Sequence, residues 1–269
     1  MFGIPRPAAI PTGVDADYFN PQPTEARWDL IFVGSMDWLA NIDAATFFVE
    51  QVLPVIRRSL PSVTVALVGR RPAPAVRELA RQHPGVTVTG TVADIRPYLW
   101  ASKVSIVPLR IGGGTRLKIY EAMAAECPVV STTIGAEGLD ARSPDEIRIG
   151  DTPDELARHC VELLRSAVAR EAQAQAAAAL VRERFSWDRV ATAFTNRRPG
   201  LLRLLRKLDA VDVDLDLPRA LEAKIELDRC HAPHVERALV AYRPLCVARE
   251  RDAESLEQAR IEGSRRRKP

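Results

Sequence analysis

Short, uninterrupted apolar segments alternate with amphipathic segments over residues 28–189, and this alternation constrains the fold more than any other feature. Strands are predicted over residues 30–34, 64–69, 86–90, 104–109, 128–133 and 147–150. They are continuous Val/Ile/Leu runs rather than alternating apolar and polar residues, which is typical of parallel strands covered on both faces. The sequence therefore predicts an α/β fold, with a doubly wound parallel sheet of about six strands and helices on both faces.

The segments between these strands have helical periodicity. Helices are predicted over residues 41–60, 73–83 and 94–102, from about residue 116, and over 152–169 and 170–185. Residues 1–27 are rich in proline and polar turn residues and are predicted to be a linker of the kind that joins two domains. Residues 28–195 are predicted to form the α/β domain.

The composition is that of a soluble globular protein, with 46% hydrophobic and 27% charged residues. The net charge of +3 is too small to favour a nucleic-acid partner. The four cysteines are far apart and lack a CxxC spacing, which argues against a disulfide framework or a zinc site. We find no signal peptide and no apolar run of transmembrane length. A cytoplasmic protein is expected, and a peripheral position at the inner face of the membrane is the alternative.

Residues 196–269 differ in character from the α/β region, and their structure is not predicted. The stretch RRPGLLRLLRKL is basic and amphipathic, and the last twenty residues are mostly charged. Three interpretations stay open: a helix at a membrane surface, a loosely packed appendage, or an extension produced by a frameshift.

The stretch RIGGGTRLKIYEAMA, residues 110–124, is the most informative for function because three glycines directly precede a predicted helix. Glycines leave backbone N–H groups accessible, and a helix N-terminus favours an anion. Arg116 and Lys118 add positive charge, and Glu121 can accept hydrogen bonds from hydroxyl groups. A diphosphate with a ribose fits this set. The alternative is a flexible turn followed by a solvated helix on which Lys118 and Glu121 form a pair.

Four stretches stand out in chain order: AIPTGVDADYF, DLIFVGSMDWLANIDA, VTVTGTVADIRPYL and VPLRIGGGTRLKIYEAMAAECPVVSTTIGAEGL. Together they resemble the C-terminal half of family 4 glycosyltransferases, over about residues 8–190. The resemblance implies a Rossmann-like domain of the two-domain GT-B fold that binds a nucleoside-diphosphate sugar as substrate, with no other cofactor. An N-terminal domain that binds the acceptor is expected to be missing, and it could be supplied by a separate chain.

The resemblance also implies positions for donor contacts. Glu121 corresponds to the glutamate that contacts the donor ribose, and Val92 lies where the base is usually held. Residues 112–115 correspond to the loop beside the sugar and the diphosphate. The predicted donor-binding residues are Gly34, Ser35, Gly90, Val92, Arg110, Gly112, Gly113, Gly114, Thr115, Arg116, Lys118 and Glu121.

Two positions depart from the family pattern. Many members have a second glutamate where this chain has Gly113, so the usual carboxylate contact to the sugar is missing. Many also have an arginine and a lysine for the diphosphate after the first strand, where this chain has Ser35 and the stretch around Asn41. Arg116 and Lys118 are expected to supply the positive charge instead.

Other constellations give weaker signals. Asp15 and Asp17 form a D-x-D, but a turn is favoured over a metal site because they do not follow a strand. The histidines lack the spacing of catalytic bases, and His83 and His159 are expected at the surface. Trp38, Trp100 and Trp187 are expected in the core, with Trp38 near the cleft. No metal ligand is predicted, and the catalytic residue stays unknown.

These observations predict the donor half of a hexosyltransferase-like glycosyltransferase, retaining and metal-independent, which is inactive without its acceptor half. The acceptor is not identified, and a polysaccharide or a lipid-linked sugar is compatible with the resemblance. The alternatives are a sugar-nucleotide epimerase, which shares the two-domain fold, and a non-catalytic nucleotide-binding module.

Overall fold

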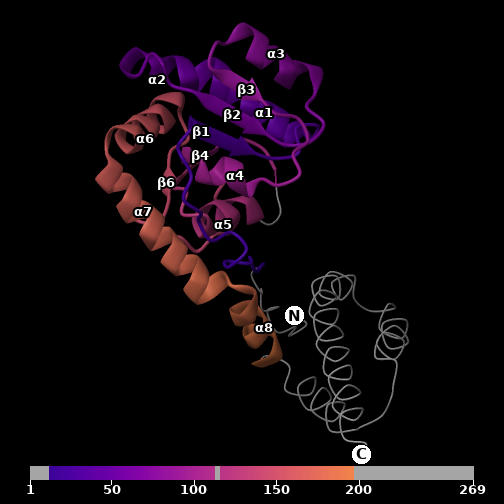
Figure 1. Ribbon diagram of the computed structural model, residues 1–269, viewed down its shortest axis with the longest axis vertical. Coiled ribbons are helices and arrows are strands. Elements are labelled where there is room, and N and C mark those ends of the chain that lie inside the picture. The colour runs from indigo at the N-terminus through magenta and orange to yellow at the C-terminus, as the bar shows by residue number, and fades with distance from the viewer. Residues whose placement is uncertain (1–11, 113–115, 197–269) are drawn as a thin grey trace, which may run out of the picture. The chain divides into compact units, whose positions relative to one another are not determined.

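A computed structural model describes residues 12–112 and 116–196 of the chain and contains one parallel sheet (Figure 1). The strands are β1 (Trp28–Val33), β2 (Val65–Val68), β3 (Val86–Val88), β4 (Ser102–Val107), β5 (Val129–Ser131) and β6 (Arg148–Ile149). Their order across the sheet is β3-β2-β1-β4-β5-β6, and every pairing is parallel. The predicted fold class is therefore confirmed.

Helices connect and cover the strands. They are α1 (Leu39–Phe47), the π-helical turn η1 (Phe48–Val52), α2 (Leu53–Ser59), α3 (Pro74–Gln82), α4 (Arg96–Trp100), α5 (Leu117–Ala124), α6 (Pro153–Arg165), α7 (Ala167–Leu180), the π-helical turn η2 (Val181–Phe185) and α8 (Trp187–Asn196). The predicted helix over 41–60 thus contains a π-helical turn. The last two predicted helices divide at Ser166 rather than after residue 169, because the Ser166 hydroxyl accepts a hydrogen bond from the Ala169 N–H and caps α7.

The direction of the chain through the sheet places helices on both faces. From β1 the chain moves outward through β2 to β3, and from β4 it moves the other way to β6. Right-handed crossovers then put α1, α2 and α3 on one face and α5 on the other (Figure 1). α6 packs against α2, and α7 packs against α5. Between these layers β2 is buried along its whole length, as a parallel strand covered on both faces should be.

The described part of the predicted linker, residues 12–27, packs against the α/β domain. Val14 and Phe19 are buried, and the Val14 N–H donates to the Phe185 carbonyl at 2.8 Å. Val14 also forms an isolated parallel bridge with Ser186. The segment has no helix or strand of its own, but its apolar side chains join the core. Residues 1–11 and 197–269 lie outside the described residues, so the predicted tail does as well.

The run of helix from Leu39 to Ser59 is long and apolar enough, by length and composition, to cross a membrane. The sequence interpretation predicted a helix over residues 41–60 but found no apolar run of transmembrane length. In the structure 56% of its most apolar window is buried within the domain. Such burial is what a core helix of an α/β domain shows, so the run is weak support for a membrane span.

Candidate functional site

The strand order defines a crevice at the centre of the sheet. β1 lies between β2 and β4, and the chain leaves β1 and β4 toward opposite edges. In open α/β sheets, ligands bind outside the carboxyl ends of the strands at such a switch point. The loop after β1, residues 34–38, and the loop after β4, residues 108–116, both begin there. Most residues predicted from the sequence to bind the donor lie in these two loops and in α5.

Two glycines shape the start of the crevice: one lets the loops after β1 and β2 approach each other closely, and the other leaves room for two polar side chains. Gly69 has a φ of +154°, and a Cβ atom added there would lie 1.7 Å from the carbonyl oxygen of Gly34. No side chain fits in that space. Gly34 has a different role, because a Cβ atom added to it would lie 2.8 Å from Asn41 Nδ2 and 3.1 Å from Lys118 Nζ. Gly34 therefore leaves room for these two side chains above the end of β1.

The Lys118 ammonium lies at this point, carried there from the first turn of α5. Its Nζ donates a hydrogen bond of 2.9 Å to Asn41 Oδ1 and lies 4.8 Å from the centre of the Phe32 ring. The Asn41 amide in turn donates from Nδ2 to the Ser35 carbonyl at 2.9 Å. One hydrogen-bonded chain thus joins α5, α1 and the loop after β1. The sequence did not single out Asn41 as a ligand-site residue.

Burial changes the titration of the two ionisable side chains of α5 at the site. The pKa of Lys118 is lowered to about 8, mainly by burial and also by the nearby positive charge of Arg116, while Glu121 acts in the opposite direction. Burial also raises the pKa of Glu121 above its usual range, and the Lys118 ammonium partly offsets this effect. Among the described residues, no ion pair joins Lys118 to a carboxylate. The alternative of a paired Lys118 and Glu121 on a solvated helix therefore differs from the arrangement in the structure.

The other basic side chains near the crevice have partners. Arg110 forms an ion pair with Asp43, with Nε 3.0 Å from Oδ2, and its guanidinium lies over the Phe47 ring. Arg116 is 7% exposed and donates from one terminal nitrogen to the carbonyls of Gly112 and Ile134. Arg116 also forms an ion pair of 3.3 Å with Glu137 and thus ties the loop after β4 to the loop after β5. Of these three cations, Lys118 alone has no carboxylate partner among the described residues.

The loop after β2 brings an arginine to the loop after β1. Arg70 Nε donates to Ser35 Oγ at 2.8 Å, and Ser35 Oγ donates to Asp37 Oδ1 at 2.7 Å. Arg71 forms an ion pair of 2.7 Å with the same aspartate. The sequence interpretation assigned these two arginines no role. Their adjacency to the first loop follows from the neighbouring positions of β1 and β2.

The loop after β3 carries Gly90 and Val92. Gly90 has a φ of +72°, and a Cβ atom added there would meet nothing within 4 Å. A hollow of about 480 Å³ adjoins it, lined by Arg71, Pro72, Arg77, Ala80, Val88, Thr89, Gly90 and Thr91. Val92 is partly buried against the core. The hollow and the Lys118 site both border the loop after β2.

Gly112 brings the loop after β4 next to the amino end of α1. Its φ is +126°, which favours glycine, and a Cβ atom added there would lie 3.6 Å from the Ala40 Cβ atom. Three of the predicted donor-binding residues, Gly113, Gly114 and Thr115, lie outside the described residues.

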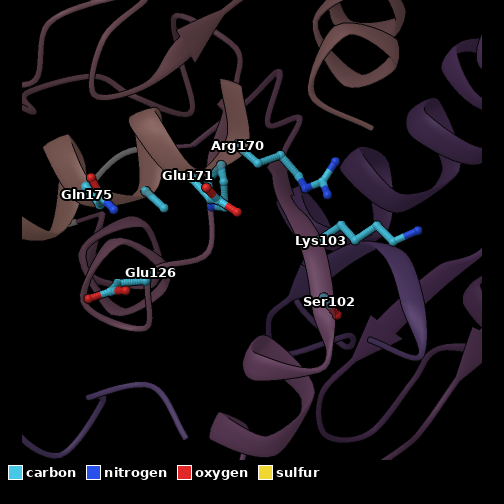
Figure 2. Close-up of a pocket in the computed structure, with 8 residues that line it drawn as sticks. Ser102, Lys103, Glu126, Arg170, Glu171 and Gln175 are labelled. Atoms are coloured by element: carbon cyan, nitrogen blue, oxygen red, sulfur yellow. The ribbon is translucent and has the colours of Figure 1, made fainter. Parts of the chain in front are cut away.

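A second hollow, of about 230 Å³, lies at the opposite end of the strands, where β4 and β5 begin, beside α7 (Figure 2). Lys103 at its rim is paired with Asp29, with Nζ 2.8 Å from Oδ1. Arg170 donates to the Leu163 and Leu164 carbonyls at the end of α6. Both side chains therefore already have partners. The hollow lies at the amino ends of β4 and β5, away from the predicted donor-binding residues. We do not assign it to the site.

Several side chains outside the crevice differ from their predicted positions. Trp38 and Trp187 are 66% and 43% exposed rather than buried, because each lies at the start of a helix, outside its core-facing side. Trp100 is partly buried, as expected. His159 is largely buried, and its Nε2 lies 3.1 Å from the Ile149 carbonyl oxygen, because α6 packs over β6.

The D-x-D motif forms a turn, as predicted. The Tyr18 N–H donates to Asp15 Oδ1 at 2.8 Å, and the Phe19 N–H donates to the Asp15 carbonyl. The Asp15 carboxylate therefore stabilises a local turn. Among the described residues, no group of three or more His, Cys, Asp or Glu side chains has an arrangement that could hold a metal ion.

The fold and the site together define an α/β domain with a crevice at the switch point of its sheet, where the Lys118 ammonium is bonded to the neutral Asn41 amide. Residues 27–166 match the family model of the glycosyl transferases group 1. The chain belongs to this family.

The chain is also similar in sequence to part of a longer bacterial protein. An uncharacterized 44.6 kDa protein in the cps region of Klebsiella pneumoniae is 23% identical over 140 residues, which are 49% of this chain and 36% of that protein. The chain therefore spans about a third of this relative.

Solved structures share the fold. The C-terminal domain of the group 1 glycosyl transferase LpcC from Francisella tularensis has a TM-score of 0.55 and 18% identity, over 65% of this chain and all of that domain. HepE from Anabaena has a TM-score of 0.57 and 17% identity, over 69% of this chain and 54% of that protein. Sucrose-phosphate synthase from Thermosynechococcus elongatus has a TM-score of 0.56 and 20% identity, over 75% of this chain and 52% of that enzyme.

Proposed function

We propose that this chain is the donor-binding domain of a glycosyltransferase and binds a nucleoside-diphosphate sugar at the carboxyl ends of β1 and β4. The observation that carries the proposal is the Lys118 ammonium, which is partly buried at the switch point and bonded to the neutral Asn41 amide at 2.9 Å. An ammonium in a poorly solvated position attracts an anion more strongly than one in water does. A diphosphate is the anion expected in a glycosyltransferase.

Three proteins of similar fold support a uridine nucleotide as the first ligand to test. HepE was solved with UDP and glucose, TarM from S. aureus with UDP, and the pneumococcal O-GlcNAc transferase GtfA with UDP and GlcNAc. These proteins are 15–17% identical to this chain, so they supply the probe rather than the assignment. The relatives reported above do not favour the epimerase alternative.

The other parts of the donor are assigned to the residues around Lys118. The diphosphate lies against Lys118 and the glycine-rich loop, and the ribose hydroxyls donate to Glu121 one turn further along α5. The base lies over Gly90 and Val92, beside the hollow that Gly90 and Thr91 border. Arg110 and Arg116 orient the loop after β4 through their partners.

We propose a retaining, metal-independent transfer, in which the departing nucleoside diphosphate is stabilised by Lys118 and by the amino ends of α1 and α5. Helix amino ends carry partial positive charge, and a fixed charge near a leaving group lowers the barrier. The donor sugar is a hexose, and the acceptor is a second sugar, either in a polysaccharide or linked to a lipid. We place the reaction in the cytoplasm, with the inner face of the membrane as the alternative.

The proposal is tested by calorimetric titration of the purified chain with UDP, GDP, ADP, the parent nucleosides and UDP-sugars. We expect binding of at least one nucleoside diphosphate, much weaker binding of its nucleoside, and no change on exchanging Mg²⁺ for EDTA. Equal affinity for diphosphate and nucleoside would contradict a diphosphate site. Loss of binding in EDTA would contradict metal independence alone.

Glu121→Gln should weaken binding of a ribonucleotide more than that of its 2′-deoxy counterpart. A carboxylate is a stronger acceptor than an amide for a ribose hydroxyl, and a hydrogen bond to a charged group contributes about 1.5–3 kcal/mol. Removing the 2′-hydroxyl beforehand should reduce the effect of the substitution. The measurement is a pair of titrations with UDP and 2′-deoxy-UDP. Equal losses for the two ligands would show that Glu121 does not contact this hydroxyl.

The affinity for UDP should fall as the pH rises from 7 to 9. Burial lowers the pKa of Lys118 to about 8, so the free protein loses the ammonium charge within this range. The charge of the diphosphate does not change between pH 7 and 9, because terminal phosphates titrate at about pH 6. If neutral Lys118 does not bind the anion, the affinity should fall about tenfold by pH 9. A constant affinity would show that Lys118 does not contact the diphosphate.

The chain alone should transfer sugar at or near the background rate, even from a donor that it binds. The described residues provide one α/β domain, and transfer requires an acceptor held in line with the anomeric carbon and protected from water. The measurement is a transfer assay on the purified 269-residue protein. Rapid turnover would show that this chain contains a complete acceptor site.

A further inference from the structure

We propose that Asn41 is a positioning residue for the donor: its neutral amide holds the Lys118 ammonium over the end of β1 without neutralising it. The proposal rests on the donor site described above. The family resemblance places the stretch around Asn41 where many members have a lysine for the diphosphate, and the sequence interpretation gave Asn41 itself no role in donor binding. Asn41 is 6% exposed and is the third residue of α1, so its polar side chain is buried on a helix face that otherwise packs in the core.

The hydrogen-bond chemistry fixes the orientation of the Asn41 amide. An ammonium has only donors, so the amide atom that faces Lys118 must be the carbonyl oxygen, and this is the 2.9 Å contact. The Ser35 carbonyl has only acceptors, so the amide nitrogen must face it, and this contact is also 2.9 Å. Asparagine satisfies both partners at once. An aspartate would place a carboxylate oxygen against the Ser35 carbonyl, and a leucine would leave both partners unbonded.

The neutral partner of Lys118 contrasts with the carboxylate partners of three other cations in the domain. Asp43, two residues further along α1, pairs with Arg110, and Asp37 on the loop after β1 pairs with Arg71. Lys103, at the other end of the strands, pairs with Asp29. In each of these pairs a carboxylate offsets the positive charge. At Lys118 the fixed partner carries no charge, so the ammonium is available to an incoming anion.

The surroundings of Lys118 leave that charge largely unopposed. Lys118 is partly buried, and Glu121 is the carboxylate that acts on it among the described residues. The positive charge of Arg116, on the preceding turn, lowers the pKa of Lys118 more than Glu121 raises it. The ammonium must also be held in place over the end of β1. Asn41 can hold it there, because Gly34 leaves room for both side chains.

The test compares Asn41→Asp, Asn41→Leu and the wild type in UDP titrations over pH 6.5 to 9.5 (roughly the range around the Lys118 pKa). At pH 7, both variants should bind UDP about tenfold or more weakly. Asn41→Asp should also move the pH midpoint of binding upward by about one unit, because an adjacent carboxylate favours the ammonium. Asn41→Leu should not move it upward. Lys103→Ala is the matched control and should leave affinity and midpoint unchanged.

A double-mutant cycle separates positioning from a general structural role. In the Lys118→Ala background, Asn41→Leu should change UDP affinity by less than about twofold, because Asn41 acts through Lys118. An equal loss in both backgrounds would overturn the proposal. The proposal would also be overturned if Asn41→Asp kept the wild-type pH midpoint and the wild-type affinity for UDP at pH 7.

A measurement without nucleotide distinguishes this inference from the proposed function. The pKa of Lys118 can be followed by NMR of its labelled side chain in the free protein, and Asn41→Asp should raise it. If the wild type binds no nucleoside diphosphate at any pH, the donor site and the role of Asn41 in it both fail. If the wild type binds UDP and Asn41→Asp leaves the Lys118 pKa unchanged, only the inference fails.

Discussion

Lys118→Ala is expected to weaken nucleoside-diphosphate binding by about 1.5–3 kcal/mol, which corresponds to roughly a 10- to 100-fold higher Kd. The expected loss is large because the ammonium is partly buried and bonded to Asn41, so a bound anion meets a charge that is partly desolvated and held in place. The affinity for the parent nucleoside should change much less, because a nucleoside has no diphosphate. The measurement is calorimetric titration of both ligands.

The control for Lys118→Ala is Lys103→Ala, which removes a lysine from the opposite end of the strands. Lys103 is paired with Asp29 and has no part in the crevice. This variant should keep wild-type affinity for both ligands. If Lys118→Ala weakens the diphosphate and the nucleoside equally, the loop and helix have a structural role and the diphosphate binds elsewhere.

Gly69→Ala is expected to be among the most destabilising single substitutions in the domain, at about 3–5 kcal/mol. The new Cβ atom would lie 1.7 Å from the Gly34 carbonyl oxygen, and Gly69 has a φ of +154°, which disfavours any other residue. Separating the loops after β1 and β2 should also displace Ser35 from Arg70 and reduce UDP affinity. The melting temperature should fall by roughly 6–20 °C, at about 2–4 °C per kcal/mol for a domain of this size.

Gly138→Ala is the matched control for this substitution. Gly138 has a φ of +77°, but a Cβ atom added there would meet nothing within 4 Å. It should therefore cost only the backbone strain of about 1–2 kcal/mol. A similar fall in melting temperature for the two variants would show that backbone strain, rather than the contact between the two loops, explains the role of Gly69.

The fold could be predicted because each strand carries its own signal. The continuous apolar runs of β1, β2 and β4 require cover on both faces, and only a parallel sheet with helices on each side provides it. Helix boundaries were less accurate. The division at Ser166 depends on a side-chain cap, and the π-helical turn η1 lies within an unbroken helical pattern. Neither feature has a periodicity to reveal it.

The site could be predicted only in part. The glycine-rich loop and α5 are adjacent in sequence, so Arg116, Lys118 and Glu121 could be grouped before the structure was known. Asn41 and Arg70 join the site through contacts across 77 and 35 residues. These contacts depend on which strands are neighbours and on the space that Gly34 leaves. Trp38 and Trp187 were predicted to be in the core but are exposed. Their apolar character alone does not say which side of a helix faces the core.

The partners of the basic residues were the least predictable feature. Arg110, Arg116 and Lys118 have similar prospects as diphosphate ligands in the sequence. In the structure Arg110 pairs with Asp43, and Arg116 bridges two loop carbonyls. Lys118 is hydrogen-bonded to the neutral Asn41 amide. The positive charge that many family members carry after the first strand is supplied here from α5.

A crystal structure of this protein with UDP would test the central claim most directly. The account predicts that a diphosphate oxygen lies within hydrogen-bonding distance of Lys118 Nζ, at the carboxyl ends of β1 and β4, with the ribose toward Glu121. A nucleotide bound instead in the hollow between β4, β5 and α7 (Figure 2), with Lys118 still bonded only to Asn41, would contradict it.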